Sequence, residues 1–177
     1  MAHLGAATRR GDATGEAEIA DDVKMRLTWM TRPNTATPPR RLELKVTSAP
    51  SNLATVRKAI ESFASANGFD TKGVAEIGLC VNEAVANIIR HAYRGNETRP
   101  VHVMAQMEDR DGGRIVITLR DWGVGIDPSS LPHRAYDPLE PGGVGLICLQ
   151  QWMDTVTYTP QADGGMLTTM TRRRMRR

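Results

Sequence analysis

The sequence is poor in the features that mark secreted and membrane-spanning proteins. Its 177 residues include only two cysteines, Cys80 and Cys148, too few for a disulfide framework and without the spacing of a zinc site. No run approaches the roughly 20 apolar residues that span a bilayer, and the first 22 residues hold no apolar segment followed by a cleavage site. We therefore expect buried thiols in a cytoplasmic protein that binds no membrane.

A strong charge imbalance is also absent. The net charge is +3, but five of the 23 basic residues are the C-terminal Arg172, Arg173, Arg174, Arg176 and Arg177. Without them 18 basic residues stand against 20 acidic ones, so the body of the chain carries about −2. This distribution argues against direct nucleic-acid binding. We interpret residues 173–177 as a solvated basic tail, with attraction to phosphates or an acidic partner as the alternative.

Average composition, with 40% apolar and 24% charged residues, indicates one globular domain. Residues 1–40 are expected to be a flexible appendage, because they are rich in Ala, Thr, Gly and acidic residues and show no sustained period. Whether residues 25–30 dock elsewhere is left open. The ordered domain is expected to cover residues 41–172.

Hydrophobic periodicity predicts the elements of this domain. Apolar residues alternate over 42–47, which predicts a strand, and a helix follows from Ser51 or Asn52 to Asn67-Gly68. A second helix is predicted from residue 71 to about 91. The second half predicts strands near 101–107 and 115–119, a loop at 126–143, a helix at 144–153, and strands at 154–160 and 166–172.

Strands and helices are thus segregated along the chain rather than strictly alternating. This order favours an α+β fold in two layers, with a mixed, mostly antiparallel sheet and helices on one face. Three short motifs lie at the ends of these expected elements, and they carry the chemistry of the sequence.

The first motif is Glu83 and Asn87 in the second expected helix. Being four residues apart, they project from one helix face about one turn from each other. A carboxylate and a carboxamide beside an apolar stripe can hold a metal, a water or a hydroxyl. Spacing alone favours the simpler interpretation, an exposed pair on the helix flank.

The second motif is Asp121-Trp122-Gly123-Val124-Gly125. Counting by twos, Asp121 continues the inward face of the strand at 115–119, so we expect a partly buried carboxylate at the end of the sheet. A buried charge needs hydrogen-bond donors, and the exocyclic amine of a purine is one. Gly123 and Gly125 would let the backbone approach a flat ring. A turn that merely ends the strand accounts for the motif equally well.

The third motif is Gly143-Val144-Gly145-Leu146, at the start of the helix expected over residues 144–153. Glycines there leave backbone N–H groups uncovered where the helix dipole favours phosphate oxygens. A flexible loop has the same composition, so this motif alone is weak. The sequence contains neither a P-loop nor the motif set of eukaryotic-type protein kinases.

Together and in this order, the three motifs resemble those of the GHKL nucleotide-binding superfamily. Residues 81–87 (VNEAVAN), 91–93 (HAY) and 143–147 (GVGLI) narrow the resemblance to the bacterial anti-sigma factor serine/threonine kinases, which are partner-switching regulators. The resemblance covers about residues 41–172. It implies the Bergerat (GHKL ATPase) fold, a histidine kinase-like ATPase domain.

The resemblance implies roles for individual residues. Asn87 would coordinate Mg²⁺, Glu83 would be the base for the attacking hydroxyl, and Asp121 would accept a hydrogen bond from the adenine of ATP. Residues 126–142 would form a lid over the nucleotide. The remaining expected cofactor-binding residues are glycines and their neighbours: Gly123 and Gly125 around adenine, and Gly143, Val144, Gly145 and Leu146 around the phosphates.

The implied function is that of an ATP-dependent protein serine/threonine kinase and anti-sigma factor. Its expected partners are a sigma factor and an anti-anti-sigma protein of STAS type, which it would phosphorylate. A homodimer is left open. The alternatives are a nucleotide-gated regulator without useful catalysis, a switch kinase that activates a phosphatase, and, more remotely, a histidine kinase fragment with His91 as phosphoacceptor.

Overall fold

The structure is a computed structural model, and it describes residues 14–20, 23–28, 38–109, 112–124 and 144–174. The strands are β1 (Thr14–Ala20), β2 (Val23–Thr28), β3 (Arg41–Thr47), β4 (Pro100–Glu108), β5 (Arg114–Arg120), β6 (Thr155–Pro160) and β7 (Met166–Arg173). The helices are α1 (Asn52–Ala66), α2 (Thr71–Asn87) and α3 (Val144–Trp152), and a π-helical turn, η1 (Ile88–Ala92), continues α2.

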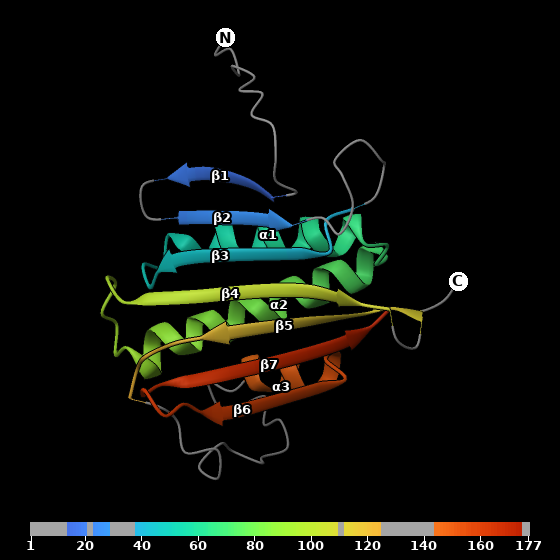
Figure 1. Cartoon of the computed structure of the whole chain (residues 1–177). Helices are drawn as coiled ribbons and strands as arrows, with labels where there is room; N and C mark the ends of the chain where they lie inside the picture. The colour runs from blue at the N-terminus through green and yellow to red at the C-terminus, as the bar shows by residue number, and fades with distance from the viewer. Residues whose placement is uncertain (1–13, 21–22, 29–37, 110–111, 125–143, 175–177) are drawn as a thin grey trace.

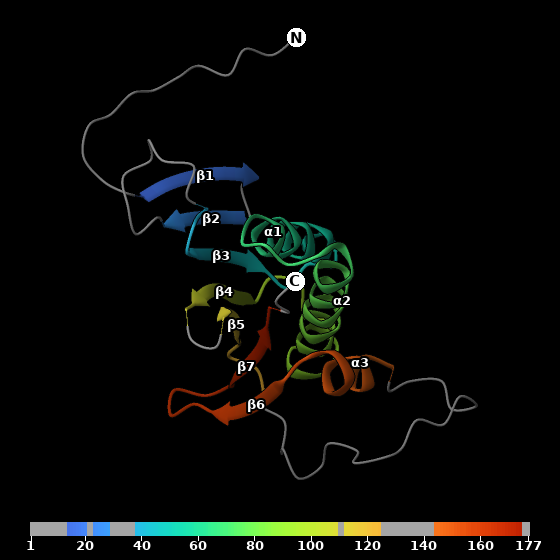
Figure 2. The same cartoon turned by 90° about the vertical axis from the view of Figure 1, so that its right-hand side faces the viewer.

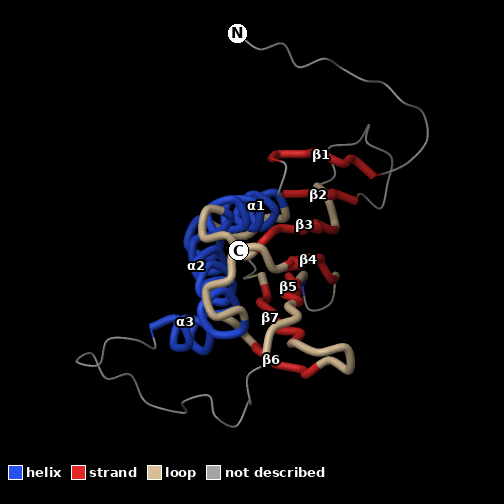
Figure 3. Tube along the Cα trace, turned by 90° about the vertical axis from the view of Figure 1, so that its left-hand side faces the viewer, coloured by secondary structure: helices blue, strands red, loops and turns tan. Residues whose placement is uncertain are grey.

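The strands form one sheet in the order β1-β2-β3-β4-β5-β7-β6 (Figure 1). All three helices lie on one face of this sheet, as two side views show (Figures 2 and 3). The predicted two-layer α+β fold is confirmed. The sequence predicted a mixed, mostly antiparallel sheet, and every neighbouring pair among the described strands is antiparallel.

The core lies between the helices and the inward face of the sheet. Leu42, Ala105, Ile117 and Met170 stand opposite one another in register on β3, β4, β5 and β7, and all are buried. The alternation that predicted these strands therefore also separates the core face from the outer face. Residues of the helices that fill the other side of this core include Val56, Ile60 and Phe63 of α1 and Ile77, Val81 and Val85 of α2.

The N-terminal segment differs from the expectation of a flexible appendage. Strands β1 and β2 fall within residues 1–40, and β2 pairs with β3 over the full length of β2, from Val23 opposite Val46 to Thr28 opposite Arg41. The sequence carried a signal for this pairing, because Val23, Met25 and Leu27 alternate with polar residues. The expectation is thus corrected for residues 14–20 and 23–28.

The prediction of a solvated basic tail over residues 173–177 is also corrected at its start. Arg173 ends β7, and the guanidinium of Arg174 donates to the backbone oxygens of Asn67 at 2.9 Å and Gly112 at 3.0 Å. The ordered part thus extends past residue 172 to Arg174, because these side chains find acceptors on the fold. Residues 175–177 lie outside the described part. Among the described helices, none has the length and apolar character that crossing a membrane requires.

Candidate functional site

The last turns of α2 bring Glu83 and Asn87 together, as their spacing predicted. Both side chains contact Arg90: its guanidinium lies 3.6 Å from the Glu83 carboxylate and donates to Asn87 Oδ1 at 3.2 Å. Arg90 is 58% exposed and Glu83 31% exposed, so this contact lies at the surface. One carboxylate oxygen and one amide oxygen thus converge on a single cation.

This donor set fits a magnesium ion. Mg²⁺ takes oxygen ligands and is usually bound by one or two protein groups together with substrate phosphates. Within the described residues no group of three or more His, Cys, Asp or Glu is arranged to hold a metal by itself. The arrangement therefore suits an ion that arrives with a nucleotide better than a resident metal.

The backbone immediately after Asn87 changes from α-helical to π-helical. The turn ends at Ala92, and the N–H of Tyr93 bonds to the oxygen of Ile88 at 2.9 Å, five residues earlier. Just beyond it, the N–H of Gly95 bonds to Ile89 O at 2.8 Å. Single π-turns are rare and frequently occur at functional sites. The sequence predicted a continuous helix to about His91, so this irregularity is a correction.

Asp121 ends the inward face of β5 and is only 2% exposed. One carboxylate oxygen accepts the N–H of Gly123 at 2.9 Å. Burial raises the pKa of this carboxyl above its usual range, and the Gly123 N–H and the Arg120 charge oppose the rise. The expectation of a buried carboxylate at the end of the sheet is confirmed, and its burial favours a ligand that brings a further donor.

Gly123 lies where two backbone segments approach each other so closely that only a glycine fits. A Cβ there would lie 2.5 Å from the oxygen of Ala92, so no larger residue fits without movement. The N–H of Val124 bonds to the same oxygen at 3.1 Å. The second motif therefore packs directly on the end of η1, which follows the first motif in the chain.

The third motif is only partly described. Helix α3 begins at Val144, where the sequence placed it, and Gly145 and Leu146 lie in its first turn. Farther along, α3 meets α2: the thiol of Cys80 donates to Cys148 O at 3.4 Å. Gly125, Gly143 and the predicted lid at 126–142 lie outside the described residues.

The thiols of Cys80 and Cys148 both have raised pKa values, and the charge of Glu83 contributes to one of them. Burial, followed by the charge of Glu83, raises the pKa of Cys148. Burial, followed by Cys148, raises the pKa of Cys80 to about 12. The prediction of buried thiols is right for Cys80, whereas Cys148 is half-buried. Because both pKa values are raised, the thiols are protonated and poorly reactive near neutral pH.

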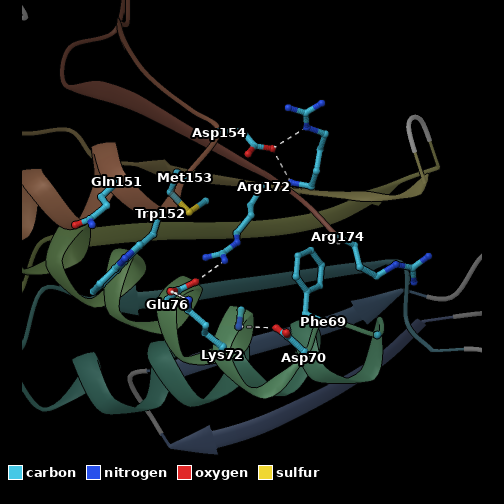
Figure 4. Close-up of a pocket in the computed structure, with 13 residues that line it drawn as sticks. Phe69, Asp70, Lys72, Glu76, Gln151, Trp152, Met153, Asp154, Arg172 and Arg174 are labelled. Atoms are coloured by element: carbon cyan, nitrogen blue, oxygen red, sulfur yellow. Dashed lines mark hydrogen bonds and ion pairs between the residues drawn. The ribbon is translucent and has the colours of Figure 1, made fainter. Parts of the chain in front are cut away.

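A cavity of about 1360 Å³ lies at the opposite end of α2 (Figure 4). It is lined by the start of α2, the end of α3 and the last residues of β7, with the Arg172–Glu76 ion pair between helix and sheet. Lys72 on its wall is fifteen positions from Asn87, roughly 22 Å along the helix. This cavity contains none of the predicted site residues.

Comparison with known proteins identifies the family of the chain. The histidine kinase-like ATPase domain family matches residues 46–172, which include all three motifs. The chain belongs to this family. The resemblance to the anti-sigma factor serine/threonine kinases is confirmed by individual relatives of this chain, whose names are those of such kinases and anti-sigma factors.

The serine-protein kinase RsbW of Bacillus licheniformis is 30% identical over 138 residues, covering 74% of this chain and 84% of that protein. The anti-sigma F factor of Oceanobacillus iheyensis is 31% identical over 135 residues, covering 74% and 90%. A solved histidine kinase domain from Erythrobacter litoralis EL346 aligns at 19% identity and a TM-score of 0.41, covering 71% of this chain and 60% of that one.

Two residues of the site had no predicted role. Arg90 contacts both residues of the first motif, and Tyr93 bonds to the second motif through its hydroxyl, which accepts the N–H of Trp122 at 2.7 Å. Arg90 lies three residues after Asn87, a spacing that signals contact on a helix. The bond from Tyr93 joins residues 29 positions apart, and periodicity carries no signal for it.

Proposed function

We propose that this chain is an ATP-dependent protein serine/threonine kinase that also binds a sigma factor. The observation that carries the proposal is the convergence of Glu83 and Asn87 on one cation, with the buried acceptor Asp121 tied to the same helix end. The names of the relatives support the kinase and anti-sigma activities. The substrate we propose is a serine or threonine of an anti-anti-sigma protein, and these partners imply a cytoplasmic site of action.

Each residue has a role that its position supports. The half-buried carboxylate of Glu83 accepts the proton of the attacking hydroxyl. The buried carboxylate of Asp121 accepts a hydrogen bond from the amine of adenine. Asn87 Oδ1 would hold Mg²⁺, which when bound neutralises charge on the phosphate oxygens. The N-terminal backbone of α3 is the proposed phosphate contact.

The reaction transfers one phosphoryl group. The hydroxyl oxygen of the substrate bonds to the γ-phosphorus while the bond from that phosphorus to the β–γ bridging oxygen breaks, and ADP leaves with the electron pair. The hydroxyl proton passes to Glu83. Such transfer depends mainly on positioning and on neutralising charge, so one base, one amide and fixed N–H groups suffice.

The test begins with a pull-down from native extract, with and without Mg-ATP, to obtain the partners. Single-turnover transfer from γ-labelled ATP to the captured antagonist is then measured for the native chain and for Glu83→Ala and Asn87→Ala. We expect both variants to lose transfer. Only Asn87→Ala should also lose ATP binding. Intact ATP binding with no transfer by the native chain would reject the kinase.

The same experiment separates the alternatives. If Glu83→Ala leaves regulation of the sigma factor intact while Asn87→Ala abolishes it, the chain is a nucleotide-gated regulator. Capture of a phosphatase-activating scaffold without a sigma factor would indicate a switch kinase. Sedimentation of the purified chain tests whether it forms a homodimer, which the sequence left open.

A further inference from the structure

The segment from Asp121 to Val124 is fixed against the end of η1 by three contacts. The N–H of Trp122 bonds to the hydroxyl of Tyr93 at 2.7 Å, and the N–H of Val124 bonds to Ala92 O at 3.1 Å. Between them Gly123 packs so closely on Ala92 that a Cβ would clash. Two of these contacts are made by the main chain, and only one, that of Tyr93, depends on a side-chain group.

The hydroxyl of Tyr93 is in turn held from the other side. It donates to Pro100 O at 2.5 Å, at the start of β4, and the residue is 6% exposed. Burial raises the pKa of Tyr93, so the hydroxyl keeps the proton that this bond requires. Tyr93 is therefore a fixed bridge between β4 and the residue after Asp121.

The other polar group of the Trp122 backbone is also held. The guanidinium of Arg99 donates to Trp122 O at 3.1 Å and lies 5.5 Å from the centre of the Tyr93 ring. With N–H and C=O both bonded, the Trp122 backbone cannot rotate without breaking one of these bonds. Such a rotation would also displace the Gly123 N–H that Asp121 Oδ1 accepts at 2.9 Å.

We propose that Tyr93 is a positioning residue for base recognition, one that fixes the Asp121 carboxylate against the helix end that follows Asn87. This inference rests on the proposed function, in which Asp121 accepts from the adenine amine. Only five residues, those of η1, separate Asn87 from Tyr93. The bridge through Tyr93 therefore fixes the distance between Asn87, the proposed metal ligand, and Asp121, the proposed acceptor for the base.

The test compares two nucleotides that differ in one group. Dissociation constants of the full chain are measured by calorimetry with Mg²⁺ for ATP and for purine riboside triphosphate, which lacks the 6-amino group. For the native chain we expect ATP to bind roughly tenfold tighter, as a hydrogen bond to a charged group provides. In Tyr93→Phe we expect this ratio to fall to about twofold, because the carboxylate is no longer aimed.

The control is Tyr158→Phe, which removes a half-buried hydroxyl from β6 and should keep the native ratio. Arg99→Met, at an exposed position, is a second test variant in case Tyr93→Phe folds poorly. In Arg99→Met the preference for ATP over purine riboside triphosphate should fall to about threefold. A ratio that stays native in both variants, even with weaker binding of both nucleotides, overturns the role of Tyr93. A native ratio near one overturns the contact between Asp121 and the adenine amine, and with it the role of Tyr93, whereas the kinase itself is tested by the transfer assay.

Discussion

The two ends of α2 are built from similar residues and differ in what those residues bind. At the N-terminal end the Asp70 carboxylate accepts the N–H of Gly73 at 2.8 Å, and Glu76 pairs with Arg172, both of them nearly buried. At the C-terminal end Glu83 and Asn87 share the exposed Arg90. The polar groups thus have nearly buried partners at one end and an exposed partner at the other, where we propose that ligands bind.

Under the proposed function, the polar groups assigned to ligands differ from the structural ones in the exposure of their partners, and cavity size does not identify them. An ion pair between exposed groups contributes little, so Arg90 can give way to a ligand at low cost. Removing one partner of a buried pair leaves an uncompensated charge. The large cavity lies at the structural end, with Arg172 Nη1 buried and without a hydrogen-bond partner in the described part of the chain.

Exchanging the Glu83 carboxylate for an amide should produce the largest effect. Glu83→Gln keeps the size of the side chain and removes the base, so we expect the single-turnover rate of transfer to fall by about 10²–10⁴-fold. ATP affinity and unfolding midpoint should stay near native values. An unfolding midpoint that drops with the rate would place Glu83 among the structural residues and erase the difference between the two ends.

The matching change at the other end should affect folding instead. Glu76→Gln leaves Arg172 unpaired in a site where both side chains are about one-eighth exposed, so we expect a loss of about 3 kcal/mol in the free energy of unfolding in urea. The control is Glu61→Gln, whose partner Arg57 is more exposed and whose loss should stay below about 1 kcal/mol. Equal losses would show that burial does not distinguish these pairs.

Asp121 combines the properties of both ends, because it is buried and yet assigned to a ligand. Asp121→Asn should weaken ATP binding at least about tenfold, since with Oδ1 on the Gly123 N–H the remaining group is an NH₂ that faces the adenine amine. Calorimetry measures this loss. Asp109→Asn, at an exposed position, is the control and should bind ATP normally.

The same variant has a pH signature without nucleotide. Because the folded-state pKa of Asp121 is raised, the folded state holds this proton more tightly than the unfolded chain, and that stabilisation is lost as pH rises through the raised pKa. Asp121→Asn should therefore be more stable than the native chain at neutral pH and equal to it at acid pH, below the usual aspartate range. Urea unfolding across pH measures this, and a constant difference at all pH values would contradict it.

The smallest effect is expected for Arg90. Arg90→Met frees the oxygens of Glu83 and Asn87, so the Mg²⁺ concentration needed for half-maximal ATP binding should fall about two- to fivefold. The free energy of unfolding should change by less than about 1 kcal/mol. A rise in the Mg²⁺ requirement would show instead that Arg90 helps to bind the nucleotide.

The sequence predicted those parts of the fold and site that depend on local periodicity. Alternation placed β3, β4, β5 and β7 and the inward carboxylate of Asp121, and the four-residue spacing placed Glu83 beside Asn87. Hydrophobic periodicity carries no signal for the π-turn η1 or for the close approach of Gly123 to its end. Contacts between distant residues, such as Arg172 with Glu76, were unpredictable for the same reason.

The N-terminal hairpin of β1 and β2 moves the free edge of the sheet from β3 to β1. Its pairing with β3 satisfies a row of backbone N–H and C=O groups that would otherwise face solvent between Arg41 and Thr47. Rows of that kind template the addition of foreign strands and lead to aggregation. A shortened chain that begins at Arg41 would keep all three motifs and expose β3 as the edge, so a segment outside the family match decides which strand of the sheet stays unpaired.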